Sequence, residues 1–177
     1  GYSYWTFSDI FAENYFSSVP FHGGFGLQTI HGIAKPSYRA VQLLHRLGHE
    51  RMLVTGEHAT VDAWVVRDHD RAAVLIVNRV FPGHPIQTES VSVRLNNTPQ
   101  PVVAWLERID QDHCNARRLW EDLGASPSPD PAELDALRAA SGLRREVFAV
   151  QANADGVVFR LNVPPDGIAC ITLEWAA

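Results

Sequence analysis

Residues 60–77 read TVDAWVVRDHDRAAVLIV, and they carry a strong structural signal. Apart from Asp62, apolar and β-branched residues fill positions 60–66, and they fill 72–77 again, with a polar segment between the two runs. Such residues favour β-strands, and the aspartates at 68 and 70 favour a turn. The stretch therefore predicts two successive strands joined by a short turn.

Further strands are expected on both sides of this pair. The same kind of apolar run recurs at 52–54, 91–95, 102–106, 157–163 and 169–173. Clusters of proline, glycine and asparagine separate most of the runs, as in Pro164-Pro165-Asp166-Gly167. Short strands at these spacings predict a mainly β fold, an antiparallel β-sandwich over residues 50–177.

A short helical insertion interrupts the strands. Asp130 has the properties of an N-cap, Pro131 suits the first helical position, and Glu133 places an acid in the first turn. These features predict a helix near 131–140 that ends close to Ser141-Gly142.

The first 49 residues differ in character from the rest. Residues 2–7 are rich in aromatic side chains and predict a strand, after which 8–26 form a long connection. Pro36 then opens a helix whose apolar stripe runs to Leu47, with Gly48 as its stop. The chain opens in a strand pattern without an initiator methionine, which we interpret as the interior of a larger fold.

The composition argues against two kinds of partner. Of the 177 residues, 46% are hydrophobic and 20% charged, and the formal net charge is -5. Nucleic acid binding needs a basic stripe, and a membrane span needs an apolar run of ~20 residues. Neither pattern is visible, so we expect no nucleic acid and no membrane partner. Cys114 and Cys170 lack metal-ligand spacing and are compatible with two buried thiols or with one disulfide.

Several long motifs carry a family resemblance. In the first fifty residues they are YWTFSDIF at 4–11, FHGGFGL at 21–27, TIHG at 29–32, KPSYRA at 35–40 and LLHRLG at 43–48. In the second half they are RID at 108–110, followed by Asp112, His113, Asn115 and Trp120. Together these motifs resemble family 39 of the glycoside hydrolases, which holds β-xylosidases and α-L-iduronidases, and the opening is more similar to the β-xylosidases.

The resemblance implies a fold and a reaction. Residues 1–49 would be the end of a catalytic (β/α)8 TIM barrel, with its last strand, a long loop and its last helix, and residues 50–177 the C-terminal β-sandwich. The reaction would be retaining hydrolysis of an O-glycosidic bond by two glutamates on earlier barrel strands, ~5 Å apart. No residue of this chain matches either glutamate motif, so we assign no catalytic residue here. We expect no cofactor and no metal.

The resemblance also implies two substrate-binding residues. Barrel active sites lie at the C-terminal ends of the strands and in the loops that follow. The tryptophan at the position of Trp5 lies at the floor of the subsite for the non-reducing-end sugar in this family, where its flat face suits a pyranose. The xylosidases usually carry two glutamates after Phe11, whereas this chain has Ala12-Glu13. Only Glu13 can therefore accept hydrogen bonds from sugar hydroxyls, and Ala12 puts xylose specificity in question.

Plainer interpretations stand beside these. Trp5 could be a barrel-core aromatic, Glu13 a solvated loop acid and Asp9 a cap or turn residue. His45 and His49 have the spacing of metal ligands on a helix, but the expected stop at Gly48 lies between them. The remaining tryptophans are expected in the sandwich core and could alternatively form a carbohydrate-binding platform: Trp64, Trp105, Trp120 and Trp175.

The resemblance thus implies the C-terminal segment of a retaining glycosidase that is more similar to the β-xylosidases than to the α-L-iduronidases. Its partners would be a xyloside-like saccharide and the upstream barrel portion of the same enzyme, and a homo-oligomer is compatible with the sandwich. The alternatives are a non-catalytic carbohydrate-binding β-sandwich and a purely structural one. Nothing in the sequence indicates the compartment.

Overall fold

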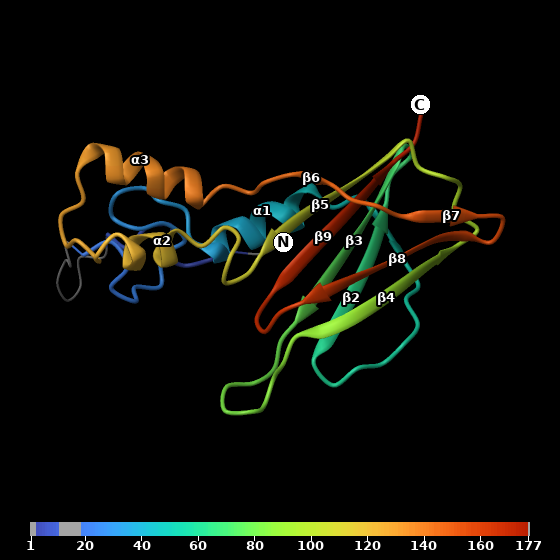
Figure 1. Ribbon diagram of the computed structural model, residues 1–177, viewed down its shortest axis with the longest axis horizontal. Helices are drawn as coiled ribbons and strands as arrows, with labels where there is room; N and C mark the ends of the chain where they lie inside the picture. Colours follow the sequence, from blue (N-terminus) through green and yellow to red (C-terminus); the bar gives the residue numbers. More distant parts are fainter. Residues whose placement is uncertain (1–2, 11–18, 177) are drawn as a thin grey trace. The chain divides into compact units, whose positions relative to one another are not determined.

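The computed structural model describes residues 3–10 and 19–176 (Figure 1). The chain divides into two compact units. The first comprises Gly1–Gln42 and Gln111–Leu143, and the second comprises Leu43–Asp110 and Arg144–Ala177. The expected division into a barrel end at 1–49 and a sandwich at 50–177 stays a prediction.

The second unit holds the strands of two antiparallel sheets. The six-stranded sheet has the order β1 (Glu50–Met52), β2 (Val61–Arg67), β3 (Arg71–Asn78), β9 (Ile168–Glu174), β5 (Val103–Ile109) and β6 (Glu146–Val147). The three-stranded sheet has the order β4 (Glu89–Asn96), β8 (Gly156–Val163) and β7 (Gln151–Asn153). Every pairing is antiparallel, which confirms the mainly β class.

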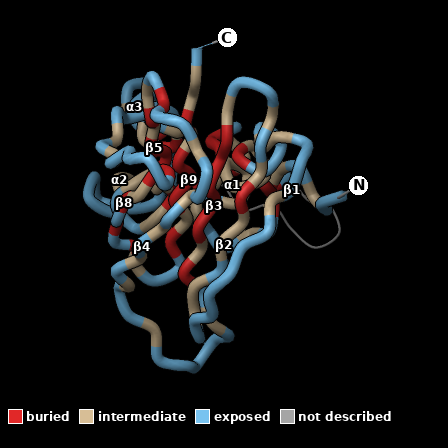
Figure 2. The backbone as a smooth tube through the Cα atoms, turned by 90° about the vertical axis from the view of Figure 1, so that its right-hand side faces the viewer, coloured by how far each residue is buried: buried red, intermediate tan, exposed pale blue. Residues whose placement is uncertain are grey.

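The two sheets share one hydrophobic core. Along β8 the side chains alternate, so that Val157, Phe159 and Leu161 are buried while Arg160 and Asn162 are exposed. The inward residues pack with buried residues of the six-stranded sheet, and the buried backbone is visible along β3 and β9 (Figure 2). Alternation of this kind turns one face of each sheet towards the other, which is the packing of a β-sandwich.

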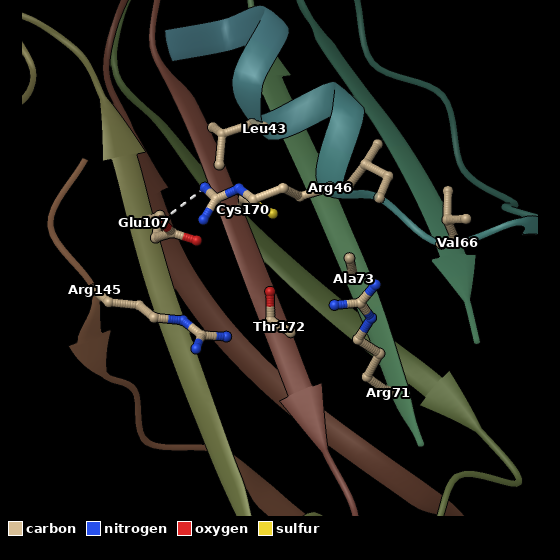
Figure 3. Close-up of a pocket in the computed structure, with 11 residues that line it drawn as sticks. Leu43, Arg46, Val66, Arg71, Ala73, Glu107, Arg145, Cys170 and Thr172 are labelled. Atoms are coloured by element: carbon tan, nitrogen blue, oxygen red, sulfur yellow. Dashed lines mark hydrogen bonds and ion pairs between the residues drawn. The ribbon is translucent and has the colours of Figure 1, made fainter. Parts of the chain in front are cut away.

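Strand β3 is buried on both faces. Val74 and Ile76 lie in the core between the sheets, and Ala73 and Leu75 on the opposite face are buried as well. The end of helix α1 (Pro36–Arg46), with Leu43, lies over that outer face (Figure 3). Burial on both sides explains why the apolar run at 72–77 lacks alternation.

The first unit is built from helices and loops. Helices α2 (Ala116–Asp122) and α3 (Pro131–Ala140) pack around a small core of Ile33, Ala116 and Leu137. Helix α3 has the expected capping box, in which Asp130 accepts from the Glu133 N–H and the Glu133 side chain accepts from the Asp130 N–H. The helices expected at 36–47 and 131–140 are therefore confirmed. Helix α2 was not predicted.

The opening segment differs from the expectation. In place of a strand at 2–7, the described residues form a single parallel bridge between Ser8 and Gln28. A regular strand needs a neighbour along its whole length, and only residues 6–9 find one here, in residues 27–28. The fold by itself therefore does not show a barrel remnant.

Both cysteines are buried free thiols, so the disulfide alternative is excluded. Cys114 donates to the carbonyl of Gly142 at 3.1 Å, and burial raises the pKa of the Cys170 thiol to about 11. Within the described ranges, every helix is too short or too polar to span a bilayer.

Candidate functional site

Trp5 lies at the surface of the first unit. Its side chain is 69% exposed, and its ring stands 6.0 Å from the ring of Phe25, centroid to centroid, at a tilt of 44°. Phe25 is itself 52% exposed, and its carbonyl accepts a hydrogen bond from the Tyr4 hydroxyl at 3.0 Å. Trp5 is therefore a surface aromatic of this chain rather than a residue of its core.

The backbone beside Trp5 is tied to a second segment. The Leu27 N–H donates to the Thr6 carbonyl at 3.1 Å, and the Gln28 N–H donates to the Phe7 carbonyl at 3.0 Å. The Asp9 N–H donates in turn to the Gln28 carbonyl at 2.9 Å. These three bonds fix the loop that carries Phe25 against the segment that carries Trp5.

A buried ion pair reinforces this attachment. The Asp9 side chain is fully buried, and its Oδ1 accepts from Lys35 Nζ at 2.6 Å and from the Gly26 N–H at 2.9 Å. Lys35 also donates to the Gly24 carbonyl at 2.6 Å. Buried charges require such partners, because removing them from water is expensive. Asp9 and Lys35 together therefore hold both residues that flank Phe25.

The second carboxylate oxygen of Asp9 has a different environment. Asp9 Oδ2 is buried without a hydrogen-bond partner among the described residues and lies 3.8 Å from His22 Nε2. His22 thus belongs to the surroundings of the ion pair.

The two glycines beside Phe25 are required by close approach to Asp9. A Cβ at Gly24 would lie 2.6 Å from Asp9 Oδ1, and a Cβ at Gly26 would lie 2.4 Å from the Asp9 backbone nitrogen. Any larger residue at either position would push the loop away from the carboxylate. The glycines of the motif FHGGFGL at 21–27 therefore allow this loop to approach Asp9 closely.

Glu13 and Ala12 lie outside the described residues, so only Trp5 of the two substrate-binding candidates is placed. Asp9, interpreted from sequence as a cap or turn residue, is instead half of an ion pair with a lysine far along the chain. Sequence reasoning missed Lys35 and Phe25. The available signals were a lysine directly before the helix-starting Pro36 and an aromatic residue between two glycines.

A second polar cluster lies in the second unit, under the end of α1. Arg46 donates to Glu107 at 2.9 Å, and the side chains of Arg71, Arg145 and Thr172 point toward the same cavity of about 50 Å³ (Figure 3). Arg71 is paired with Asp68 and Arg145 with Glu174, so the charges are balanced. A cavity of this size has room for water and not for a sugar ring. The cluster joins α1 to the sheet.

The histidines that have metal-ligand spacing are separated by the end of the helix. His45 lies within α1, whereas His49 follows it and its Nδ1 lies 2.9 Å from Asp68 Oδ1. That contact and the bond from Arg71 lower the pKa of Asp68 to about 2. The part of the chain that the structure describes contains no group of three or more histidine, cysteine or acidic side chains able to hold a metal ion.

The four remaining tryptophans are partly buried: Trp64, Trp105, Trp120 and Trp175. Trp105 donates to Glu174 at 3.1 Å, Trp120 to the Ser126 carbonyl at 2.8 Å and Trp175 to the Pro99 carbonyl at 2.9 Å. Trp120 belongs to the small core of the first unit and not to the sandwich. An aromatic platform on the sandwich would need rings open to solvent, whereas Trp64, Trp105 and Trp175 are partly buried.

Comparison with known proteins gives the family. The model of glycosyl hydrolases family 39 matches residues 1–158, and the chain belongs to this family. It is 38% identical over 176 residues to a β-xylosidase of Caldicellulosiruptor saccharolyticus, covering 98% of this chain and 36% of that protein. It is 32% identical to a β-xylosidase of Geobacillus stearothermophilus, covering 92% of this chain and 31% of the relative.

Solved structures agree with this assignment. A monomeric β-xylosidase from Caulobacter crescentus CB15 superposes with a TM-score of 0.81 at 26% identity, over 99% of this chain and 38% of that one. A family 39 enzyme from Xanthomonas axonopodis pv. citri superposes with a TM-score of 0.77 at 27% identity, over 98% of this chain and 37% of that one. The chain thus spans about a third of the length of the proteins it matches.

Proposed function

We propose that this chain is the C-terminal segment of a retaining glycosidase that hydrolyses β-xylosides. The observation that carries the proposal is the match to β-xylosidases over 98% of the chain, at 38% identity in one relative. In this proposal residues 1–49 are the last strand, long loop and last helix of a (β/α)8 barrel. The two catalytic glutamates lie on earlier strands of the same polypeptide.

The segment contributes two residues to the pocket for the non-reducing-end sugar. Trp5 presents its flat face to the C–H face of the pyranose, and Glu13 accepts hydrogen bonds from sugar hydroxyls. The exposure of Trp5 on a backbone held by hydrogen bonds supports this role. Bonds to sugar hydroxyls that tighten at the oxocarbenium-like transition state lower the barrier as well as improving binding.

The sandwich of the second unit is an accessory domain in this proposal. Its partner is the upstream barrel, and it also offers a surface for a homo-oligomer. The alternative of a carbohydrate-binding sandwich receives no support from the tryptophans of the second unit, since Trp64, Trp105 and Trp175 are all partly buried.

The experiment is a kinetic comparison of full-length variants on an aryl β-xyloside. We expect Trp5→Ala and Glu13→Gln each to lower kcat/KM by about 10- to 100-fold, which corresponds to about 1.4–2.8 kcal/mol of transition-state stabilisation. Phe81→Ala is the control, because Phe81 is an exposed aromatic of the second unit that has no place in the proposed pocket. An enzyme in which Trp5→Ala has the kinetics of Phe81→Ala would contradict the proposal.

A further inference from the structure

We infer that Phe25 is a second substrate-contacting residue, whose ring forms an aromatic corner with Trp5 for the apolar face of a pyranose, and that the Asp9–Lys35 pair positions it. This inference rests on the proposed function of Trp5 as a sugar-contacting residue. It adds a residue from the loop after the barrel strand to the pocket.

The geometry of the two rings is that of a corner rather than a stack. Their centroids are 6.0 Å apart and their planes are tilted by 44°, so neither ring covers the face of the other. Trp5 remains 69% exposed and Phe25 52% exposed. Two rings tilted in this way can contact one flat ligand from two sides.

The position of Phe25 is fixed from both of its neighbours. Gly24 is held through its carbonyl by Lys35, and Gly26 is held through its N–H by Asp9. The carbonyl of Phe25 itself accepts from the Tyr4 hydroxyl. An aromatic side chain on a loop with this many constraints loses little further freedom when a ligand binds, which is the condition for strong apolar recognition.

In this chain the exposure of the two rings works against the stability of the first unit. Burying a phenylalanine is worth about 1.5–3 kcal/mol, and exposing two large rings side by side forgoes much of this gain. A buried ion pair and two obligatory glycines nevertheless keep Phe25 at the surface beside Trp5. Exposed apolar surface of this kind marks a contact site, and the two tilted rings suit a flat ligand.

Two other exposed aromatic residues of the described ranges, Phe7 and Phe81, lack this combination. Phe7 packs edge-on against Tyr38 with a centroid distance of 6.4 Å. Phe81 is 76% exposed in the connection between β3 and β4 of the second unit. Phe81 therefore serves as a matched control that removes the same exposed ring elsewhere.

The test is steady-state kinetics of the full-length enzyme on an aryl β-xyloside, together with the melting temperature of each variant. We expect Phe25→Ala to raise KM about tenfold with kcat changed less than about twofold, because the lost contact is present in both ground state and transition state. Phe25→Tyr and Phe25→Trp should retain KM near the parent value, since both keep a flat ring. Phe81→Ala should leave both constants unchanged.

The positioning part has its own readout. Lys35→Met should raise KM in the parent enzyme and should have little additional effect in the Phe25→Ala background, because both changes remove the same contact. Lys35→Arg, which keeps the charge, should restore part of the affinity. Independent, additive effects of the two substitutions on KM would overturn the positioning role.

The outcomes separate this inference from the proposed function. If Trp5→Ala impairs the enzyme while Phe25→Ala leaves KM unchanged and only lowers the melting temperature, Phe25 packs against protein and the inference is wrong. If Trp5→Ala has no kinetic effect, the proposed pocket itself is wrong. A higher KM for Phe25→Ala, together with a KM near the parent value for Phe25→Tyr, would support both the inference and the proposed function.

Discussion

The Asp9 carboxylate is fully buried and depends on Lys35, whose Nζ lies 2.6 Å away. A single buried charge of this kind is more expensive than a buried neutral group, because it exchanges hydration for a small number of protein contacts. The pair also fixes the loop between His22 and Leu27. Loss of the pair would therefore also change the position of the exposed ring of Phe25. At this scale the role of Trp5 in substrate binding stays a prediction, and sequence reasoning failed to find Lys35 as the partner of Asp9.

The failure has a physical cause. Cap and turn roles are local, and they can be read from neighbouring residues. An ion pair between positions 9 and 35 depends on the path of the chain between them, and no periodicity records that path. The glycines at 24 and 26 carried the relevant signal, but their reason is a close approach to Asp9 that only coordinates reveal.

The energetics of the pair can be tested on the chain itself. We expect Lys35→Met to lower the free energy of unfolding by about 3–5 kcal/mol, because it leaves the Asp9 charge buried and unpaired. The double variant Asp9→Asn with Lys35→Met should be more stable than Lys35→Met alone, since the uncompensated charge is gone. Denaturant unfolding followed by circular dichroism measures both. If the loss of unfolding free energy in the double variant equalled the sum of the losses in Lys35→Met and in Asp9→Asn alone, the two side chains would not interact.

Among the elements, long or capped segments were predictable and short ones were not. The continuous run in β3 and the capping box of α3 are strong local signals, and both elements are present. Helix α2 has an N-cap in Asn115 but only seven residues, and β6 has two. Elements this short are determined by what they pack against rather than by propensity. The opening strand failed for a related reason, because strand formation needs a partner along its length.

The helix cap of α3 supports a prediction at this scale. Asp130→Ala removes the acceptor for the Glu133 N–H, which is bonded at 2.9 Å, and should lower the free energy of unfolding by about 1 kcal/mol. Ser128→Ala is the matched control, because it removes a small polar side chain just before the cap. Thermal unfolding of the two variants beside the parent chain gives the comparison. Equal melting temperatures for both variants would mean that the capping box does not contribute.

At the scale of the whole molecule, the chain corresponds to one part of its family 39 relatives. The chain matches family 39 over most of its residues yet spans only about a third of the relatives it resembles. The buried carboxylates of the described residues are both neutralised, Asp9 by Lys35 in the first unit and Glu107 by Arg46 in the second. Both carboxylates are thus engaged in ion pairs within the chain.

This reasoning leads to a prediction about activity. Retaining hydrolysis requires a pair of carboxyls ~5 Å apart on either side of the scissile bond. We therefore expect the purified 177-residue chain to show no turnover of an aryl β-xyloside, even when circular dichroism shows that it is folded. The full-length enzyme, assayed at the same molar concentration, is the positive control. Turnover that co-elutes with the pure chain on gel filtration, and that Glu13→Gln abolishes, would place a catalytic carboxylate within this segment instead of upstream of it.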